Sequence, residues 1–150
     1  MTITETLKEL FLRELQKLED EIAGFPDEAM LWKTSGDIKN SAGNLCLHLC
    51  GNIQHFIGAY FGNTGYARNR DAEFSSRNIA KEKLIEEIKQ SKQAIEKAFA
   101  VISTDDLKKI YPQNFMGKEV TADYFIIHLI SHFDYHLGQI NYLRRFLLKS

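Results

Sequence analysis

Three of the chain's five histidines, His128, His132 and His136, follow one another at four-residue spacing near the C-terminal end. Residues four apart share one face of an α-helix, so two of these imidazoles can direct nitrogen atoms at a single ion. A third imidazole from a facing helix would complete a site that leaves a position open for water or a substrate. Hydrogen-bonded core histidines and a pH-sensitive stripe are the alternative interpretations of this spacing.

A second polar stripe lies within NSAGNLCLHLCGNIQHFIG, residues 40–58. At helical periodicity, one face of this segment carries Asn44, His48, Asn52 and His55. Buried amides and imidazoles cost free energy unless they are paired, so the stripe requires partners. A cation shared with the C-terminal histidines would satisfy both stripes at once.

The preferred ligand set combines His48 with His132 and His136. The spacing also allows His128 and His132 as the pair, and His55 as the third ligand. Any histidine of the two stripes that is not a ligand would line the pocket. Three imidazoles suit zinc, nickel and iron alike, so the sequence does not choose the metal.

Three amide side chains are candidates for orienting the ligands or lining the pocket. Asn44 and Asn52 each lie one turn from His48, and Gln139 lies on the histidine face of the C-terminal segment. Outer groups of this kind orient metal-bound imidazoles in many proteins. Packing between helices is the alternative role for these amides.

The segment RNRDAEF, residues 68–74, places Arg68 and Arg70 close to two carboxylates. At the mouth of a pocket, an arginine would suit a carboxylated ligand because its guanidinium binds carboxylates with two hydrogen bonds. A salt-bridged surface loop is the plainer interpretation of the same residues.

The sequence lacks the motifs of two other classes of metal site. There is no Glu-x-x-His pair of a di-iron bundle and no His-Glu-x-x-His of a zinc protease. Cys46 and Cys50 lie one helical turn apart and face away from His48, so on a helix they complete neither the metal site nor a disulfide. We therefore expect reduced, packed thiols, as in a cytoplasmic protein.

Four segments with apolar residues at helical spacing must position these side chains; they span residues 4–23, 41–61, 78–102 and 121–148. The polar stretch between the second and third segments is too irregular to predict a helix. The connection before the last segment carries a short hairpin near Met116 and Gly117. The pattern predicts an all-α four-helix bundle that forms a single domain over residues 1–150.

Charge and hydropathy limit the kinds of partner that the chain is expected to bind. The formal net charge is -1, without the basic excess of a nucleic-acid binder. Neither a signal peptide nor a membrane span is predicted, because every apolar run is short or interrupted by charge. We expect a cytoplasmic protein with a small-molecule substrate. The last segment is apolar on its other side too, at Ile126, Ile130 and Leu137, which favours a homodimer.

The stretches NLCLHLCGNIQHFIG and HFDYHLGQINYLRR resemble the DinB-like superfamily of metal-binding four-helix bundles. The resemblance covers nearly the whole chain and includes the closing HxxxHxGQI pattern. NSAGNLCLHLCGN and RNRDAEF are similar to a subgroup of that superfamily filed as uncharacterised. The resemblance implies an up-down-down-up bundle, frequent homodimers, and a zinc, nickel, iron or manganese ion held by His48, His132 and His136.

Characterised members of the superfamily include S-transferases and isomerases that use low-molecular-weight thiols such as bacillithiol and mycothiol. By this resemblance the chain would be a metal-dependent thiol S-transferase. A non-catalytic, stress-linked protein that binds a metal or ligand is the alternative, as is a metal-dependent hydrolase. Whether the chain is an enzyme is left open by its sequence.

Overall fold

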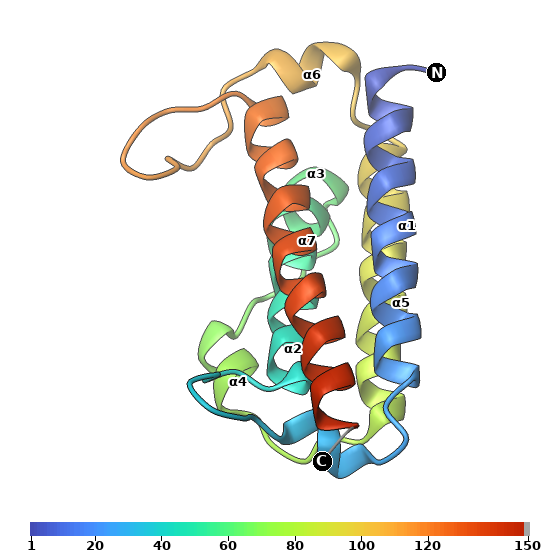
Figure 1. Ribbon diagram of the computed structural model, residues 1–150. Coiled ribbons are helices and arrows are strands. Elements are labelled where there is room, and N and C mark those ends of the chain that lie inside the picture. The colour runs from blue at the N-terminus through green and yellow to red at the C-terminus, as the bar shows by residue number, and fades with distance from the viewer. Residues whose placement is uncertain (149–150) are drawn as a thin grey trace.

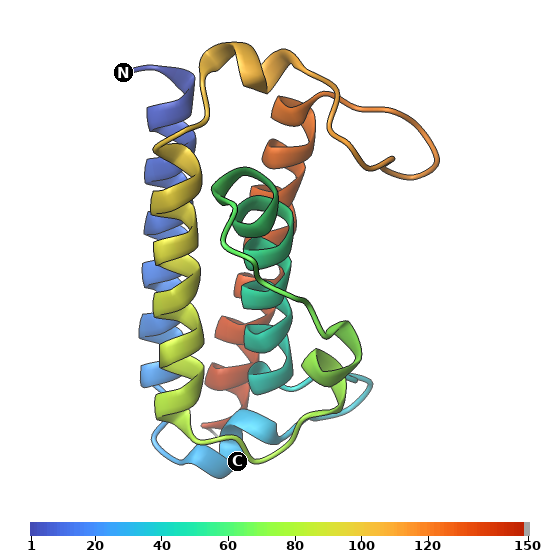
Figure 2. The same ribbon diagram turned by 180° about the vertical axis from the view of Figure 1, so that it is seen from behind.

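The computed structural model describes residues 1–148, and these form a bundle of four helical columns (Figure 1). The columns are α1 (Ile3–Ala23); a second column made of α2 (Ala42–Ile53), η2 (Gln54–Ala59) and α3 (Tyr60–Gly62); α5 (Lys81–Phe99); and α7 (Ala122–Leu147). The first and last columns run in one direction and the middle two in the other (Figure 1 and Figure 2). The predicted all-α bundle of up-down-down-up order is therefore confirmed.

Helices α1 and α5 pack side by side and form the more regular half of the bundle (Figure 2). Their facing stripes bury Leu7, Phe11, Leu15, Leu18 and Ile22 from α1, and Leu84, Ile88, Ile95, Ala98 and Phe99 from α5. Full burial of each large apolar side chain stabilises the fold by about 1.5–3 kcal/mol. Most charged residues between these positions face solvent, which is the amphipathic pattern that the sequence predicts, whereas Glu14 is buried and paired with Arg13 and Lys17.

The second column and α7 form the other half and face each other. Helix α2 begins where predicted, because the Ser41 hydroxyl accepts a hydrogen bond from the backbone N–H of Asn44 at 3.2 Å. Thr121 stands at the predicted start of α7, but its hydroxyl bonds to the Asp123 carboxylate instead of the helix backbone. Both polar stripes thus lie on helices that pack together.

The second column differs from a plain α-helix between Gln54 and Ala59, where it widens into a π-helical turn. A π turn rotates the residues that follow it relative to the α-helical periodicity. His55 lies in this turn and packs its ring against Phe56 at 4.7 Å between centroids. The Tyr111 hydroxyl donates a hydrogen bond to the Phe56 carbonyl at 2.8 Å. Four-residue spacing therefore does not carry from His48 to the end of this column.

Short helices occupy the connections: η1 (Glu28–Trp32), α4 (Arg70–Ser75) and α6 (Thr104–Lys108). The prediction of an irregular stretch between the second and third columns was wrong over α4, because the Asn69 side chain caps this turn by accepting from the Ala72 N–H. The next column starts at Lys81, after Asn78 adopts a left-handed φ of 59°. The hairpin prediction is confirmed by the bridge from Phe115 to Lys118.

The structure bears on two expectations, the state of the cysteines in α2 and the role of the apolar back of α7. Cys46 and Cys50 are buried free thiols, as predicted. Ile126 and Leu137 are buried inside the single chain, so the apolar back of α7 does not require a second copy, and the homodimer stays a prediction. Among residues 1–148, no helix is long and apolar enough to cross a membrane.

Candidate metal centre

Three imidazoles from two facing helices meet in the middle of the bundle. His48 of α2 and His132 and His136 of α7 each offer a ligand atom, and these atoms lie within 4.8 Å of one another. The Nε2 atoms of His48 and His132 are 3.3 Å apart. In tetrahedral zinc sites, nitrogens about 2.0–2.1 Å from the ion are separated by about 3.3 Å. Elsewhere in residues 1–148, no other such group of three ligands comes together.

The hydrogen bonds of His48 define which of its nitrogens is free. Its Nδ1 lies 3.1 Å from Oε1 of Glu73, and because an ionised carboxylate can only accept, we assign the proton to Nδ1. Nε2 then carries the lone pair, 3.3 Å from Nε2 of His132. Nδ1 of His132 is buried without a hydrogen-bond partner among the described residues. Buried polar atoms are normally paired, so protein atoms alone do not satisfy this imidazole.

The surroundings keep the C-terminal pair of imidazoles neutral. Burial, followed by the charges of His136 and His48, lowers the pKa of His132 to about 4. Burial also lowers the pKa of His136, against the opposing effect of its hydrogen bond to Gln139. Neutral imidazole is the form that binds metal ions, so both residues are ready to act as ligands at neutral pH.

Sequence reasoning placed Glu73 of α4 only among the charged residues near a pocket mouth and missed its contact with His48. Its buried carboxylate contacts His48 and is held by Arg68, whose Nε lies 2.8 Å from Oε2 and whose Nη2 lies 2.9 Å from Oε1. Burial raises the pKa of Glu73, but the hydrogen bonds from His48 and Arg68 outweigh it and hold the pKa below its usual value. The carboxylate is thus ionised and fixes the tautomer and orientation of the His48 ring.

Two residues of α2 allow Glu73 to approach so closely. A Cβ atom on Gly51 would lie 2.0 Å from Oε2 of Glu73, so only glycine leaves room for the carboxylate. The Asn44 side chain donates to the backbone carbonyls of Glu73 at 3.0 Å and Ser76 at 2.9 Å. Asn44 therefore clamps α4 onto α2, which is a more indirect role than ligand orientation.

Gln139 supports the second helix of the site. Its Oε1 lies 2.7 Å from Nδ1 of His136. If Nδ1 donates this hydrogen bond, Nε2 of His136 is left as the free, metal-binding nitrogen. Each of His48 and His136 therefore has an acceptor behind its ring, Glu73 for one and Gln139 for the other.

The remaining candidates lie around the centre instead of in it. A cleft of about 300 Å³, lined by both polar and aromatic side chains, opens at His48 and His132, and we call it the arginine cleft. Its polar lining consists of Asn52, Arg68, Arg70, Gln113, Asn114 and His128. His128 lies outside the group of three and packs on Phe115, with 4.3 Å between ring centroids. His55 is outside the group as well.

The sequence does contain signals for Glu73, although weak ones. Gly51 lies inside the predicted helix, one turn after His48, and a glycine within a helix can mark close approach by another segment. The acidic residue that meets it lies in the RNRDAEF segment, five positions after Arg68. Spacing alone could not pair them, because Glu73 reaches the site through tertiary folding of α4.

Solved structures with a similar fold and one matching family model are known for this chain. A crystal structure of a conserved protein from Enterococcus faecalis is similar over 100% of this chain and 99% of that one, at 18% identity and a TM-score of 0.77. A DinB-like protein from Bacillus cereus is similar over 90% of this chain and 89% of that one, at 17% identity and a TM-score of 0.69. No curated protein matches the chain. A family model matches residues 3–150, and the chain therefore belongs to the DinB-like family described as "Protein of unknown function (DUF1572)".

Proposed function

We propose that the chain holds a divalent metal ion with His48, His132 and His136 and transfers a low-molecular-weight thiol to an electrophile at this centre. The observation that carries the proposal is the meeting of three imidazoles whose ligand atoms lie within 4.8 Å of one another. The rings of His48 and His136 each have an acceptor behind them, and burial lowers the pKa values of His132 and His136.

Charge balance around the histidines supports activation of an anionic ligand. The negative charge of Glu73 is offset by Arg68, which binds it through two hydrogen bonds. Three neutral imidazoles add no charge of their own. A divalent ion in such surroundings keeps its charge and lowers the pKa of a bound thiol or water. The protein's part is to hold the three imidazoles at fixed distances and, by burial, to keep His132 and His136 neutral.

The arginine cleft supports a carboxylated thiol, such as bacillithiol, as the nucleophile. Arg68 already holds the Glu73 carboxylate through two hydrogen bonds. Arg70 is exposed, stacks over Phe74 at 5.4 Å from the ring centroid, and forms no ion pair with any of residues 1–148. Its guanidinium, together with the amides of Gln113 and Asn114, could bind a carboxylate at the cleft mouth.

Metal content is the first test. Purified protein should contain close to one divalent ion per chain, and His48→Ala, His132→Ala and His136→Ala should each lose most of it. His55→Ala and His128→Ala are matched controls, because both remove a histidine outside the group of three, and they should keep the metal. Unchanged occupancy in all three ligand variants would remove this ligand set.

Thiol consumption is the second test. Metal-loaded protein should accelerate the reaction of bacillithiol, mycothiol, glutathione or cysteine with monochlorobimane, and a chelator should abolish the acceleration. Bound metal without consumption of any of these thiols would contradict the transferase. A metal- or ligand-binding protein, or a hydrolase that activates water at the same centre, would then account for the site.

A further inference from the structure

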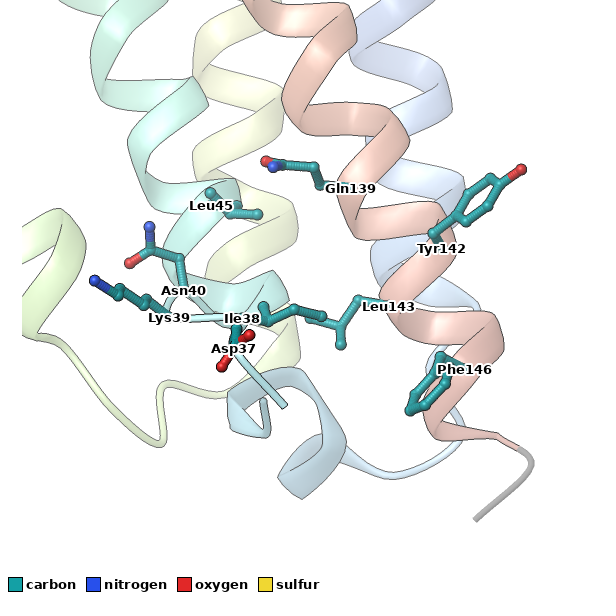
Figure 3. Close-up of a pocket in the computed structure, with 9 residues that line it drawn as sticks. All are labelled: Asp37, Ile38, Lys39, Asn40, Leu45, Gln139, Tyr142, Leu143 and Phe146. Atoms are coloured by element: carbon teal, nitrogen blue, oxygen red, sulfur yellow. The ribbon is translucent and has the colours of Figure 1, made fainter. Parts of the chain in front are cut away.

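We propose that a cavity on the other side of the histidines binds the alkyl or aryl group of the electrophile. This Gln139 cavity has a volume of about 570 Å³ and is lined mainly by Ile38, Leu45, Gln139, Tyr142, Leu143 and Phe146 (Figure 3). The proposal rests on the proposed function, because it assigns the second substrate of the same reaction. Its volume falls in the range of small-molecule sites.

The walls of the cavity come from three separate segments. Leu143 extends from α7 toward Ile38 in the loop before α2, and Phe146 lies one turn beyond it (Figure 3). Leu45 of α2 closes the inner side and is itself buried. Ile38 is 45% exposed and Phe146 is 62% exposed, so large apolar surface faces the open space. A ligand there would gain by removing this surface from water.

The cavity shares a wall with the metal centre. The Gln139 side chain points from α7 toward Leu45 (Figure 3). Its Oε1 lies 2.7 Å from Nδ1 of His136 and accepts from it when Nε2 of His136 is the metal-binding nitrogen. This assignment leaves the Gln139 amide NH₂ without a hydrogen-bond partner among residues 1–148. Leu45 lies three residues before His48 on the same helix. A molecule whose apolar group fills the cavity would thus present its polar end to the Gln139 NH₂ and the histidines.

The linings of the arginine cleft and the Gln139 cavity differ, and this difference indicates which substrate each one binds. The arginine cleft at His48 and His132 presents two arginines and several amides beside the rings of Phe56, Phe115 and Phe125, and its cationic groups suit a charged thiol. The Gln139 cavity has mainly aliphatic and aromatic walls, with Asp37 and Lys39 offering one charge of each sign. A neutral molecule with an alkyl or aryl group fits such a lining better than an anion or a cation.

The reaction then places each reactant on its own side of the imidazoles. The thiolate sulfur attacks the electrophilic carbon, so an S–C bond forms while the bond from carbon to the leaving group breaks. With a halide electrophile, the halide departs with the bonding electron pair, and the thiol proton has already passed to solvent. Selectivity would follow the apolar group, since each buried CH₂ changes affinity about fourfold.

Binding of a neutral apolar probe tests the cavity without needing metal or turnover. We expect metal-free protein to bind N-phenyl-1-naphthylamine saturably, with the blue-shifted fluorescence of an apolar site. Ile38→Ser should weaken the Kd at least about fivefold, because it removes an apolar wall of the cavity, and Phe146→Ser should do the same. Ile127→Ser is the matched control, because Ile127 is 49% exposed on α7 and lines no described pocket; it should leave the Kd unchanged.

Competition between two electrophiles tests the assignment to the reaction. With metal-loaded protein and bacillithiol, Ile38→Ser should lower the rate with benzyl bromide at least about fivefold and leave the rate with iodomethane unchanged. Equal loss with both electrophiles would overturn the assignment to the apolar group. Absence of saturable probe binding, or the same Kd in all three variants, would overturn the cavity itself.

Two further outcomes are distinguishable. In the first, wild-type protein is a dimer by light scattering and binds no probe, whereas Ile38→Ser is a monomer. This surface then belongs to a second copy of the chain, and the proposal fails. If the probe binds in an Ile38-dependent manner but wild-type protein holds no metal, the proposed function fails, and with it the assignment to an electrophile.

Discussion

The two halves of the bundle differ in what they bury: one buries mainly apolar side chains, and the other also buries polar ones. Helices α1 and α5 meet through nearly uninterrupted apolar stripes, and most of their charges lie outside, apart from the buried Glu14 of α1. The half built from the second column and α7 buries His48, Asn44 and Asn52, accepts a π-helical turn, and needs α4 to deliver Glu73. Polar groups inside a protein must be paired, whereas apolar ones need only be packed. We therefore expect stability to depend chiefly on the first half and chemistry on the second.

The largest expected effect is a loss of stability caused by a substitution in the apolar half, formed by α1 and α5. Phe11 of α1 is fully buried and packs against Phe99 of α5, with ring centroids 6.2 Å apart. Phe11→Ala should lower the free energy of unfolding by about 3–5 kcal/mol, because it removes apolar contacts and leaves a cavity. Urea denaturation of metal-free protein measures this loss. A change below about 1 kcal/mol would show that the halves do not divide stability as proposed.

The next effect belongs to the site. Glu73→Gln should weaken metal affinity about 10–100-fold, because the neutral amide orients and polarises His48 less well. Competition with a chelating dye measures the affinity, and Glu82→Gln, an exposed carboxylate on α5, is the control that should not change it.

Gly51→Ala sharpens this prediction, because the new Cβ must displace the carboxylate of Glu73. The single variants should each weaken metal affinity, and the double variant should be little worse than Glu73→Gln alone. Additive losses in this cycle would mean that Gly51 acts on the centre by some route other than Glu73.

Acid should act on the site half through His132. Its pKa is about 4 in the folded chain against 6.5 as the reference value, so the unfolded chain takes up the proton first. The stability that depends on neutral His132 should be complete above pH 6.5 and decline as the pH falls toward 4. Metal-free His132→Gln should show a smaller loss over this range than wild-type protein in parallel denaturation curves. An equal loss would assign the acid sensitivity to other groups.

The smallest effect concerns the contact between the halves. Burial, together with Glu14 of α1, raises the pKa of Asp134 to about 6. A raised carboxyl pKa means that stability falls as the pH rises from 3.8 through 6, because the folded chain releases its proton later than the unfolded one. Asp134→Asn should therefore stabilise the protein at pH 7, by up to about 1 kcal/mol. Thermal unfolding at pH 4 and pH 7 checks this, and a gain that is the same at both pH values would contradict it.

Helical periodicity was enough to predict the four columns and to bring His48 opposite His132 and His136, because one face of each helix is largely determined by its local residues. The same reasoning placed His55 on the face of His48, and the π turn shows the limit of assuming 3.6 residues per turn. Arg68 was predicted near the pocket mouth, with a salt-bridged loop as the plainer interpretation, and its ion pair with Glu73 fits that interpretation. The contact of Glu73 with His48 was not predicted. Contacts between α4 and α2 depend on chain folding over more than twenty residues, which local periodicity does not encode.

The clamp between Asn44 and α4 makes the connection before α5 a thermodynamic partner of the metal centre. Whatever binds the free nitrogen of His48 also favours the conformer in which Glu73 is docked, so opening of α4 and loss of ligand are linked equilibria. Backbone amides of residues 70–75 should then exchange with solvent more slowly when the ion is present. A six-residue helix outside the four columns would in this way report occupancy of the bundle's interior to the protein surface.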